Sequence, residues 1–246
     1  MCLACLAASV AGLGDPVQSA ARAHVGPDAG TPGGGARREH ERRVYRRQAR
    51  LQDRGTLVRT LAALIGEPQS TRAWERGAIG EERVGAVLEK AHSRGVLALH
   101  DRRIPRSRAN IDHIAIGPAG VFVIDAKRYE NAKIRVRRVG GLFSPRRDEL
   151  LVRGRVKSNL VEGLRRQVEV VQTVLDEAGI EDVPVRGVLC FVDAFFPLFQ
   201  RRLRVDELIV TCRPALGGVV SAPGHLDAAA RHDLYCLVGE RLPSMT

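Results

Sequence analysis

Two aspartates and a lysine stand where neighbouring β-strands would bring them onto one surface. Asp112 lies in the segment Asn-Ile-Asp-His-Ile-Ala-Ile at 110–116, and Asp125 and Lys127 end the segment Val-Phe-Val-Ile-Asp-Ala-Lys at 121–127. Both segments are rich in β-branched residues, and the Gly-Pro-Ala-Gly loop between them predicts a β-hairpin. If the strands pair without a bulge up to this loop, Asp112 faces Asp125. Lys127 then points to the same side as Asp125, because side chains alternate along a strand.

This arrangement would suit phosphodiester chemistry with a hard cation. Directly opposed residues have Cβ atoms about 4.5–5.5 Å apart, so two carboxylates in these positions repel each other. Mg²⁺ or Mn²⁺ would relieve the repulsion, since such cations bind carboxylate oxygens together with water and phosphate. Lys127 would supply a fixed positive charge beside the phosphate or orient the attacking water. The alternative is that Asp112 and Asp125 stand at a solvated sheet edge beside an ordinary lysine.

A third carboxylate, Glu81, belongs to a segment with helical periodicity. Val84, Val87, Leu88 and Ala91 define its buried face. At 100° per residue Glu81 lies about 20° from Leu88, so it points inward, where an unpaired carboxylate is costly. Gly80 falls on the same face and would permit close approach to the sheet. The alternative is a partly exposed glutamate in the first turn, stabilised by the helix dipole.

Several separated blocks of residues, in the same order along the chain, resemble the nuclease-related domain, NERD, of the PD-(D/E)XK nuclease superfamily. The resemblance covers roughly Trp74 to Asp176 and rests on Gly-Ala-Ile-Gly-Glu at 77–81, Ile-Pro at 104–105, Asn-Ile-Asp-His at 110–113 and Gly-Val-Phe-Val-Ile-Asp-Ala-Lys at 120–127.

The resemblance implies a restriction-endonuclease-like core with a defined set of active-site residues. Asp112 stands in the place of the first acidic residue of the superfamily, and Asp125-x-Lys127 in the place of its acid-x-Lys pair. Glu81 corresponds to the acidic residue of the first helix. Gln167 resembles the polar residue that faces the site from the second core helix, although it would equally fit as an ordinary residue at the border of an apolar stripe.

The elements that must position these residues follow from hydrophobic periodicity. A helix is expected over 77–92, then strands over 96–100, 111–116 and 121–127. Apolar residues trace a second helix from Leu160 to Ala178, which Gly179 ends. Further strands are expected over 133–138, 150–152, 185–192 and 208–212, and a last helix over 226–238. The core order of helix, three strands, helix and strand predicts a mixed α/β (α+β) fold, with a mixed sheet flanked by helices.

Composition divides the chain into three parts. Residues 1–36 begin with an apolar stretch that is rich in small residues. From Gly14 they continue mainly as Gly, Ala, Pro and Asp without hydrophobic periodicity, so we expect residues 1–36 to be disordered. Residues 37–72 are rich in arginine and predict a basic, partly helical arm that either contacts a nucleic-acid backbone or serves as a solvated linker. Residues 73–246 form the nuclease-like domain.

The chain is strongly basic, with a formal net charge of +11 and a pI of about 10.3. Such a charge favours a polyanionic partner, because each phosphate contact releases counterions; an arginine-rich proteome would give the same composition. Arg103, Arg106 and Arg108 surround Pro105 in a loop before the first acidic strand. We expect them to contact phosphates, unless they form a solvated loop.

The cysteines, the histidines and the apolar segments indicate what kinds of site and location are expected. The five cysteines form no metal-binding array and their odd number favours a reducing, cytoplasmic location; Cys190 is expected to be buried. His113 should lie on the face opposite Asp112, in a structural role. His100 and Asp101 end a strand and could reach the site. No apolar segment approaches the roughly 20 residues that a membrane span needs.

These observations lead to a specific hypothesis. We predict a nuclease that depends on Mg²⁺ or Mn²⁺ and hydrolyses phosphodiester bonds of DNA, with RNA as a second candidate substrate, in DNA processing or repair. The alternative is a non-catalytic module on a nuclease-like fold, which binds nucleic acid or docks a partner and retains the acids as relics.

Overall fold

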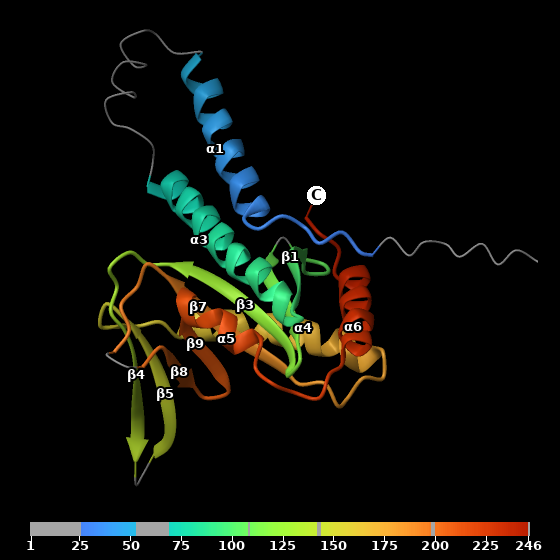
Figure 1. Ribbon diagram of the computed structural model, residues 1–246. Helices are drawn as coiled ribbons and strands as arrows, with labels where there is room; N and C mark the ends of the chain where they lie inside the picture. The colour runs from blue at the N-terminus through green and yellow to red at the C-terminus, as the bar shows by residue number, and fades with distance from the viewer. Residues whose placement is uncertain (1–25, 53–68, 108, 142–143, 198–199, 246) are drawn as a thin grey trace, which may run out of the picture.

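The protein is built around a central sheet that has helices on both faces and a smaller sheet at one side (Figure 1). The computed structural model describes residues 26–52, 69–107, 109–141, 144–197 and 200–245.

The central sheet contains six strands and is mixed. In order across the sheet these are β1 (Leu97–Arg103), β2 (Asn110–Gly117), β3 (Gly120–Arg128), β7 (Val185–Val192), β9 (Leu208–Cys212) and β8 (Arg202–Val205). Strands β1 to β3 pair antiparallel, β3, β7 and β9 run parallel, and β8 is antiparallel to β9. Strand β7 has a neighbour on each side and is buried over residues 187–192, as its almost wholly apolar sequence predicts.

Four helices cover the two faces of this sheet. α3 (Gln69–Ala91), which the short 3₁₀ helix η1 (His92–Arg94) follows, lies on one face with α5 (Arg213–Val220); α4 (Ser158–Glu177) and α6 (Ala228–Arg241) lie on the other. The alternation of β3 separates the two cores, because Phe122 and Ile124 pack with α3 and α5 whereas Val121 and Val123 pack with α4 and α6. Gly179, at a φ of 72°, follows the end of α4.

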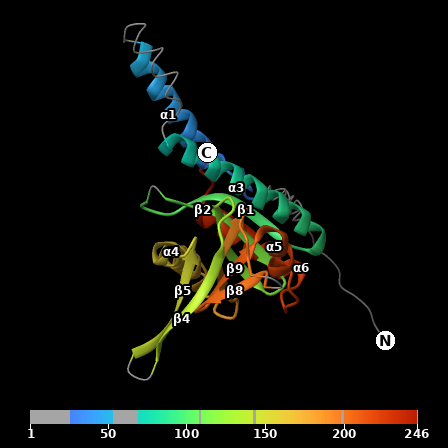
Figure 2. The same ribbon diagram turned by 90° about the vertical axis from the view of Figure 1, so that its left-hand side faces the viewer.

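A small sheet extends away from the core. It consists of β4 (Ile134–Gly141), β5 (Ser144–Val152) and β6 (Arg155–Val156), in that order. Figures 1 and 2 show the β4–β5 hairpin reaching out beyond the central sheet. Its base is anchored by Ile134, Leu150 and Val152, which are buried in the core on the α4 side.

The N-terminal region packs on this core. The helix α1 (Gly34–Gln52) lies beside α3, as Figures 1 and 2 both show. We expected disorder over residues 1–36, of which the structure describes 26–36. Within these, the carbonyl oxygen of Ala29 accepts a hydrogen bond from the backbone N–H of His100 at 2.7 Å, and that of Asp28 accepts one from Arg102 Nη1 at 2.6 Å.

The expected order of core elements is confirmed, and the architecture is consistent with a restriction-endonuclease-like fold. The sequence-based boundaries fall short mainly at α3, which begins eight residues before Gly77. Strands β6 and β8 and helix α5 were not predicted from the sequence. All three are short, and α5 contains Pro214 and a Gly-Gly pair, which obscure helical periodicity.

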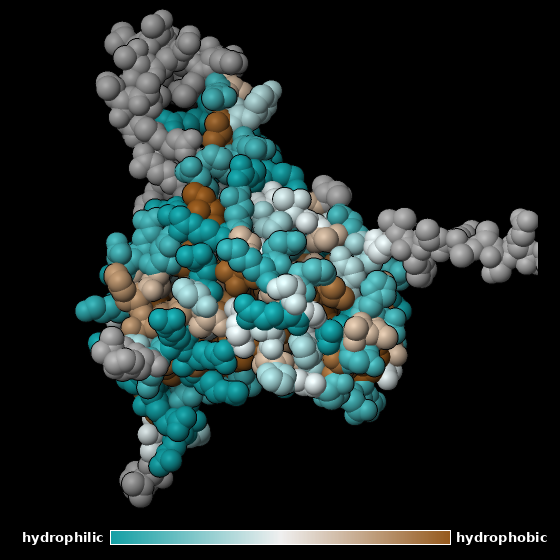
Figure 3. Space-filling model, viewed as in Figure 1, coloured by the Kyte–Doolittle hydropathy of each residue, from teal (hydrophilic) through white to brown (hydrophobic). Residues whose placement is uncertain are grey.

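Hydrophilic residues cover much of the face shown in Figure 3. No helix within the described part of the chain is long and apolar enough to cross a membrane.

Candidate active site

The β2–β3 hairpin has the register that the sequence predicts. Ile116 pairs with Val121 and Ile114 with Val123. Continued to the strand ends, this register sets Asp112 opposite Asp125. The two strands are also tied by a side chain here, because Asp112 Oδ2 accepts a hydrogen bond from the backbone N–H of Ala126 at 3.0 Å.

Asp125 and Lys127 form an ion pair on this surface. Asp125 is 4% exposed, and its Oδ1 accepts a hydrogen bond from Lys127 Nζ. Burial by itself would lower the pKa of Lys127, but the charges of Asp125 and Asp112 outweigh burial and raise this pKa. Lys127 therefore keeps its proton, and it supplies a permanent positive charge among the carboxylates.

Glu81 reaches the same place from α3. A glycine allows α3 to come close to β3, because a Cβ atom at Gly80 would stand 3.1 Å from Cβ of Arg128. This confirms the close approach expected at Gly80. Glu81 is only 7% exposed, and its Oε2 has no hydrogen-bond partner among the described residues.

The carboxylates disfavour one another's ionisation. Burial, followed by the charges of Asp112 and Asp101, raises the pKa of Glu81 to about 9. Burial and the charge of Asp125 raise the pKa of Asp112 to about 7. Three carboxyl groups therefore share a single lysine, and the cluster would favour a further cation.

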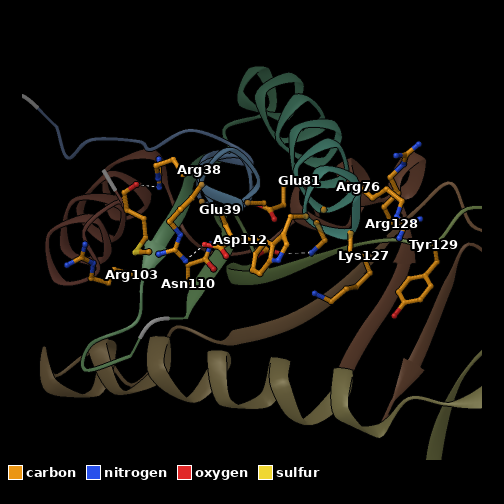
Figure 4. A pocket seen from close by; sticks show the side chains of 18 of the residues that line it. Arg38, Glu39, Arg76, Glu81, Arg103, Asn110, Asp112, Lys127, Arg128 and Tyr129 are labelled. Carbon is orange, nitrogen blue, oxygen red and sulfur yellow. Dashed lines mark hydrogen bonds and ion pairs between the residues drawn. The ribbon is translucent and has the colours of Figure 1, made fainter. Parts of the chain in front are cut away.

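The cluster opens into a cavity of about 1250 Å³. Glu81, Asp112 and Lys127 line it, together with residues of α1, the first turns of α3, and the ends of β1 and β3. In Figure 4, Glu81 and Asp112 lie in the middle of this cavity, with Arg38 and Arg103 to one side and with Lys127, Arg128 and Tyr129 to the other. Asp125 is not among the lining residues and is paired with Lys127.

The remaining predicted site residues are not all brought to this cavity. Arg103 lines it and is exposed. Arg106 is exposed in a turn with a φ of 57° but is not a lining residue, and Arg108 lies outside the described residues. Gln167 is half-buried on α4 and does not line the cavity; its buried Oε1 finds no partner within the described residues.

The two histidines and Asp101 do not line the cavity, although Asp101 is bonded to two residues that do. His113 lies on the α3 side of the sheet, opposite Asp112 as expected, and its Nδ1 is 2.8 Å from Nδ1 of His100. Burial lowers the pKa of both rings, so they are neutral at neutral pH. The Asp101 carboxylate accepts hydrogen bonds from Arg38 Nη2 at 2.6 Å and from Asn110 Nδ2 at 2.7 Å.

The motifs and periodicity of the sequence did not predict that α1 contributes to this site. Arg38, Glu39 and Arg42 line the cavity from α1, and Trp74 and Arg76 do so from the start of α3. Trp74 is the only tryptophan of the chain and is 40% exposed. An isolated tryptophan in an otherwise polar segment is the one sequence signal that could have indicated that the start of α3 lines the cavity.

A mixed sheet whose hairpin presents Asp and Asp-x-Lys, with a glutamate from the preceding helix, defines a domain of the PD-(D/E)XK nuclease-like class. The family model of the nuclease-related domain, NERD, matches residues 76–192. The chain therefore contains a NERD domain, which extends from α3 to the end of β7. No curated protein and no solved structure matches the chain.

Proposed function

We propose that this domain hydrolyses phosphodiester bonds of DNA with Mg²⁺ or Mn²⁺, in DNA processing or repair. The observation that carries the proposal is the buried carboxylate cluster at the floor of a basic cavity. Glu81 has one carboxylate oxygen without a partner among the residues that the structure describes, and both Glu81 and Asp112 have raised pKa values. Such a cluster is costly to keep unless it serves a ligand.

The donor set fits a hard divalent cation. Asp112 and Asp125 would hold it with help from Glu81, since all three supply carboxylate oxygens. Across the described residues, however, no three His, Cys, Asp or Glu side chains are already grouped as metal ligands. When bound, the cation would polarise the phosphate and lower the pKa of a water molecule.

The side chains around the acids have separate tasks in this proposal. Lys127 keeps a proton and stabilises negative charge that develops on the scissile phosphate. Arg103 and Arg76 bind the neighbouring phosphates of the strand, because both line the cavity and neither forms an ion pair with a described residue. Gln167 is proposed to support the lysine or the metal ligands from α4.

Cleavage assays test this function directly. Purified full-length protein is incubated with plasmid, linear duplex, single-stranded DNA and RNA, with Mg²⁺, Mn²⁺ or EDTA. We expect cleavage with either metal and none with EDTA, and a loss on the order of 10²-fold or more in Asp125→Asn and in Lys127→Met. Asp182→Asn, at an exposed position, is the matched control.

The outcomes separate the enzyme from its alternative. Binding of DNA without cleavage under any of these conditions would indicate the non-catalytic module. Cleavage that persists unchanged in Asp125→Asn would show that another site does the chemistry.

A further inference from the structure

The cavity wall formed by α1 and by Ala73 and Trp74 at the start of α3 precedes the matched NERD segment. We propose that this wall makes the site selective for single-stranded nucleic acid, whose unpaired base stacks on Trp74 while its phosphates bind the arginines around the acids. The inference rests on the proposed function and adds the substrate class to it.

The wall is fixed to the domain at the start of α1. Arg38 pairs with the buried carboxylate of Asp101, and Arg37 pairs with Glu82 of α3. A Cβ atom at Gly35 would stand 2.7 Å from Asp101 Oδ1, so the first turn of α1 sits directly against this carboxylate. These contacts anchor the start of α1 beside the cavity, where side chains of α1 form part of the lining.

The ring of Trp74 is in contact with Arg43 and is still accessible from the cavity. Its residue surface is 40% exposed on the cavity, and the guanidinium carbon of Arg43, from α1, lies 5.5 Å from the centre of the ring. A cation–π contact from one helix thus orients an aromatic ring of the other. Core packing gives no reason to expose a large aromatic here, whereas stacking of a base does.

The charge of the lining suits a nucleic-acid backbone. Seven of the lining residues are basic and four are acidic. In Figure 4, Arg103 lies on one side of Glu81 and Asp112 and Arg76 on the other, and neither forms an ion pair with a described residue. A strand that follows these groups would pass its phosphates over the acidic centre.

An aromatic ring in this cavity distinguishes single strands from duplexes. In a duplex each base is stacked between its neighbours and is paired, so its face is unavailable to Trp74. In a single strand the base face is free, and aromatic stacking is a general feature of single-strand binding that does not depend on base identity. The wall therefore favours unpaired segments or ends without selecting a sequence.

The single tryptophan makes the test site-specific. Because Trp74 is the only tryptophan, the indole fluorescence of the full-length protein reports this position alone. The protein is titrated in EDTA with an oligothymidylate of about 12 nucleotides and with a blunt duplex of equal length. Binding is followed in parallel by the anisotropy of labelled strands. We expect quenching by the single strand and little change with the duplex.

Three variants complete the test. Trp74→Ala should weaken binding of the single strand about tenfold and leave binding of the duplex unchanged. Trp74→Phe should retain most of the affinity, because a phenyl ring still stacks on a base, and the unchanged duplex binding of Trp74→Ala excludes a folding defect. Tyr45→Ala, an exposed aromatic of α1 that does not line the cavity, should bind like the wild type.

Three other outcomes would overturn the inference, and each identifies the step that fails. Tight binding of the single strand without quenching, or with unchanged affinity in Trp74→Ala, would show that the base does not stack there, while cleavage that requires Asp125 would still support the nuclease. Equal quenching by the duplex would overturn the substrate class. Failure to bind any nucleic acid would overturn both the inference and the proposed function.

Discussion

At the scale of single residues, the site is organised by an imbalance of charge. Asp125 has a partner in Lys127, whereas Glu81 and Asp112 are left with raised pKa values. From the sequence, neutralising Asp125 should stabilise the metal-free protein, because it removes the repulsion between Asp125 and Asp112. The ion pair changes this expectation for Asp125. Removing the charge of Asp125 would leave the buried ammonium group of Lys127 without its paired carboxylate, which is destabilising. Glu81 is the residue whose charge the metal-free fold tolerates least.

Glu81→Gln should therefore stabilise the metal-free protein. The folded pKa of about 9 lies above the ordinary value of 4.5, so between these pH values the folded state binds a proton that the unfolded state has lost. Stability from this group is fully present below pH 4.5 and is lost as pH rises towards 9. In EDTA at pH 8 the variant should gain on the order of 2 kcal/mol in the free energy of unfolding.

Urea unfolding at pH 5 and pH 8 measures this effect, with the exposed Glu162→Gln of α4 as the control. The gain should be larger at pH 8 than at pH 5. A variant that is less stable than the wild type at pH 8 would mean that the fold stabilises the Glu81 carboxylate by an ion pair or by hydrogen bonds to both of its oxygens.

At the scale of elements, the approach of α3 to β3 decides whether Glu81 can act with the aspartates. The helix packs mainly on the face of Phe122 and Ile124, opposite to the face of Val123 that Asp125 shares. Gly80 brings α3 against Arg128 near the end of β3. There the carboxylate of Glu81 comes close enough to the aspartates to influence their ionisation.

Gly80→Leu should consequently damage both stability and activity. The added side chain would press on Arg128, and overpacking of this kind costs about 1–3 kcal/mol. It would also move Glu81 away from Asp112, so metal-dependent cleavage should fall. Gly163→Leu on α4 is the matched control, since a Cβ atom at Gly163 meets nothing described within 4 Å and the residue does not line the cavity. Equal stability of the two variants, measured by urea unfolding, would contradict the close contact.

At the scale of the whole molecule, the protein has a high net positive charge, and several of its arginines line the cavity that contains the acids. The net charge of +11 attracts any polyanion. The cavity would guide a bound polyanion towards the acids, because arginines from α1, α3 and β1 line the same cavity as Glu81 and Asp112. A basic surface alone would bind nucleic acid without placing a phosphate near Lys127.

Neutralising two of these cavity arginines should change the salt dependence of binding. In the double variant Arg42→Gln and Arg76→Gln, fewer counterions are released, and the slope of log K against log salt for a single strand should shrink by about 1.4. Arg204→Gln, at an exposed position on β8, should change the slope less. Anisotropy titrations over a range of salt concentrations provide the slopes; equal slopes for all three proteins would place the binding path elsewhere.

The amino-acid sequence by itself determined the local features of this site. Alternation and loop length set the register that places Asp112 beside Asp125, and helical periodicity turned Glu81 inward. These features depend on neighbours a few residues apart, and the described structure has them. Sequence also carried the family blocks that the NERD match reflects.

Only the tertiary structure decided what surrounds the acids. It packs α1 on α3, fixes Asp101 against the start of α1 and places Trp74 on the cavity, while Gln167 and Arg106 stay out of the lining. These contacts join segments that are tens of residues apart, and α1 shows little amphipathic pattern because its arginines dominate it. Periodicity reports which face of an element is buried, but the choice of partner for that face depends on long-range packing.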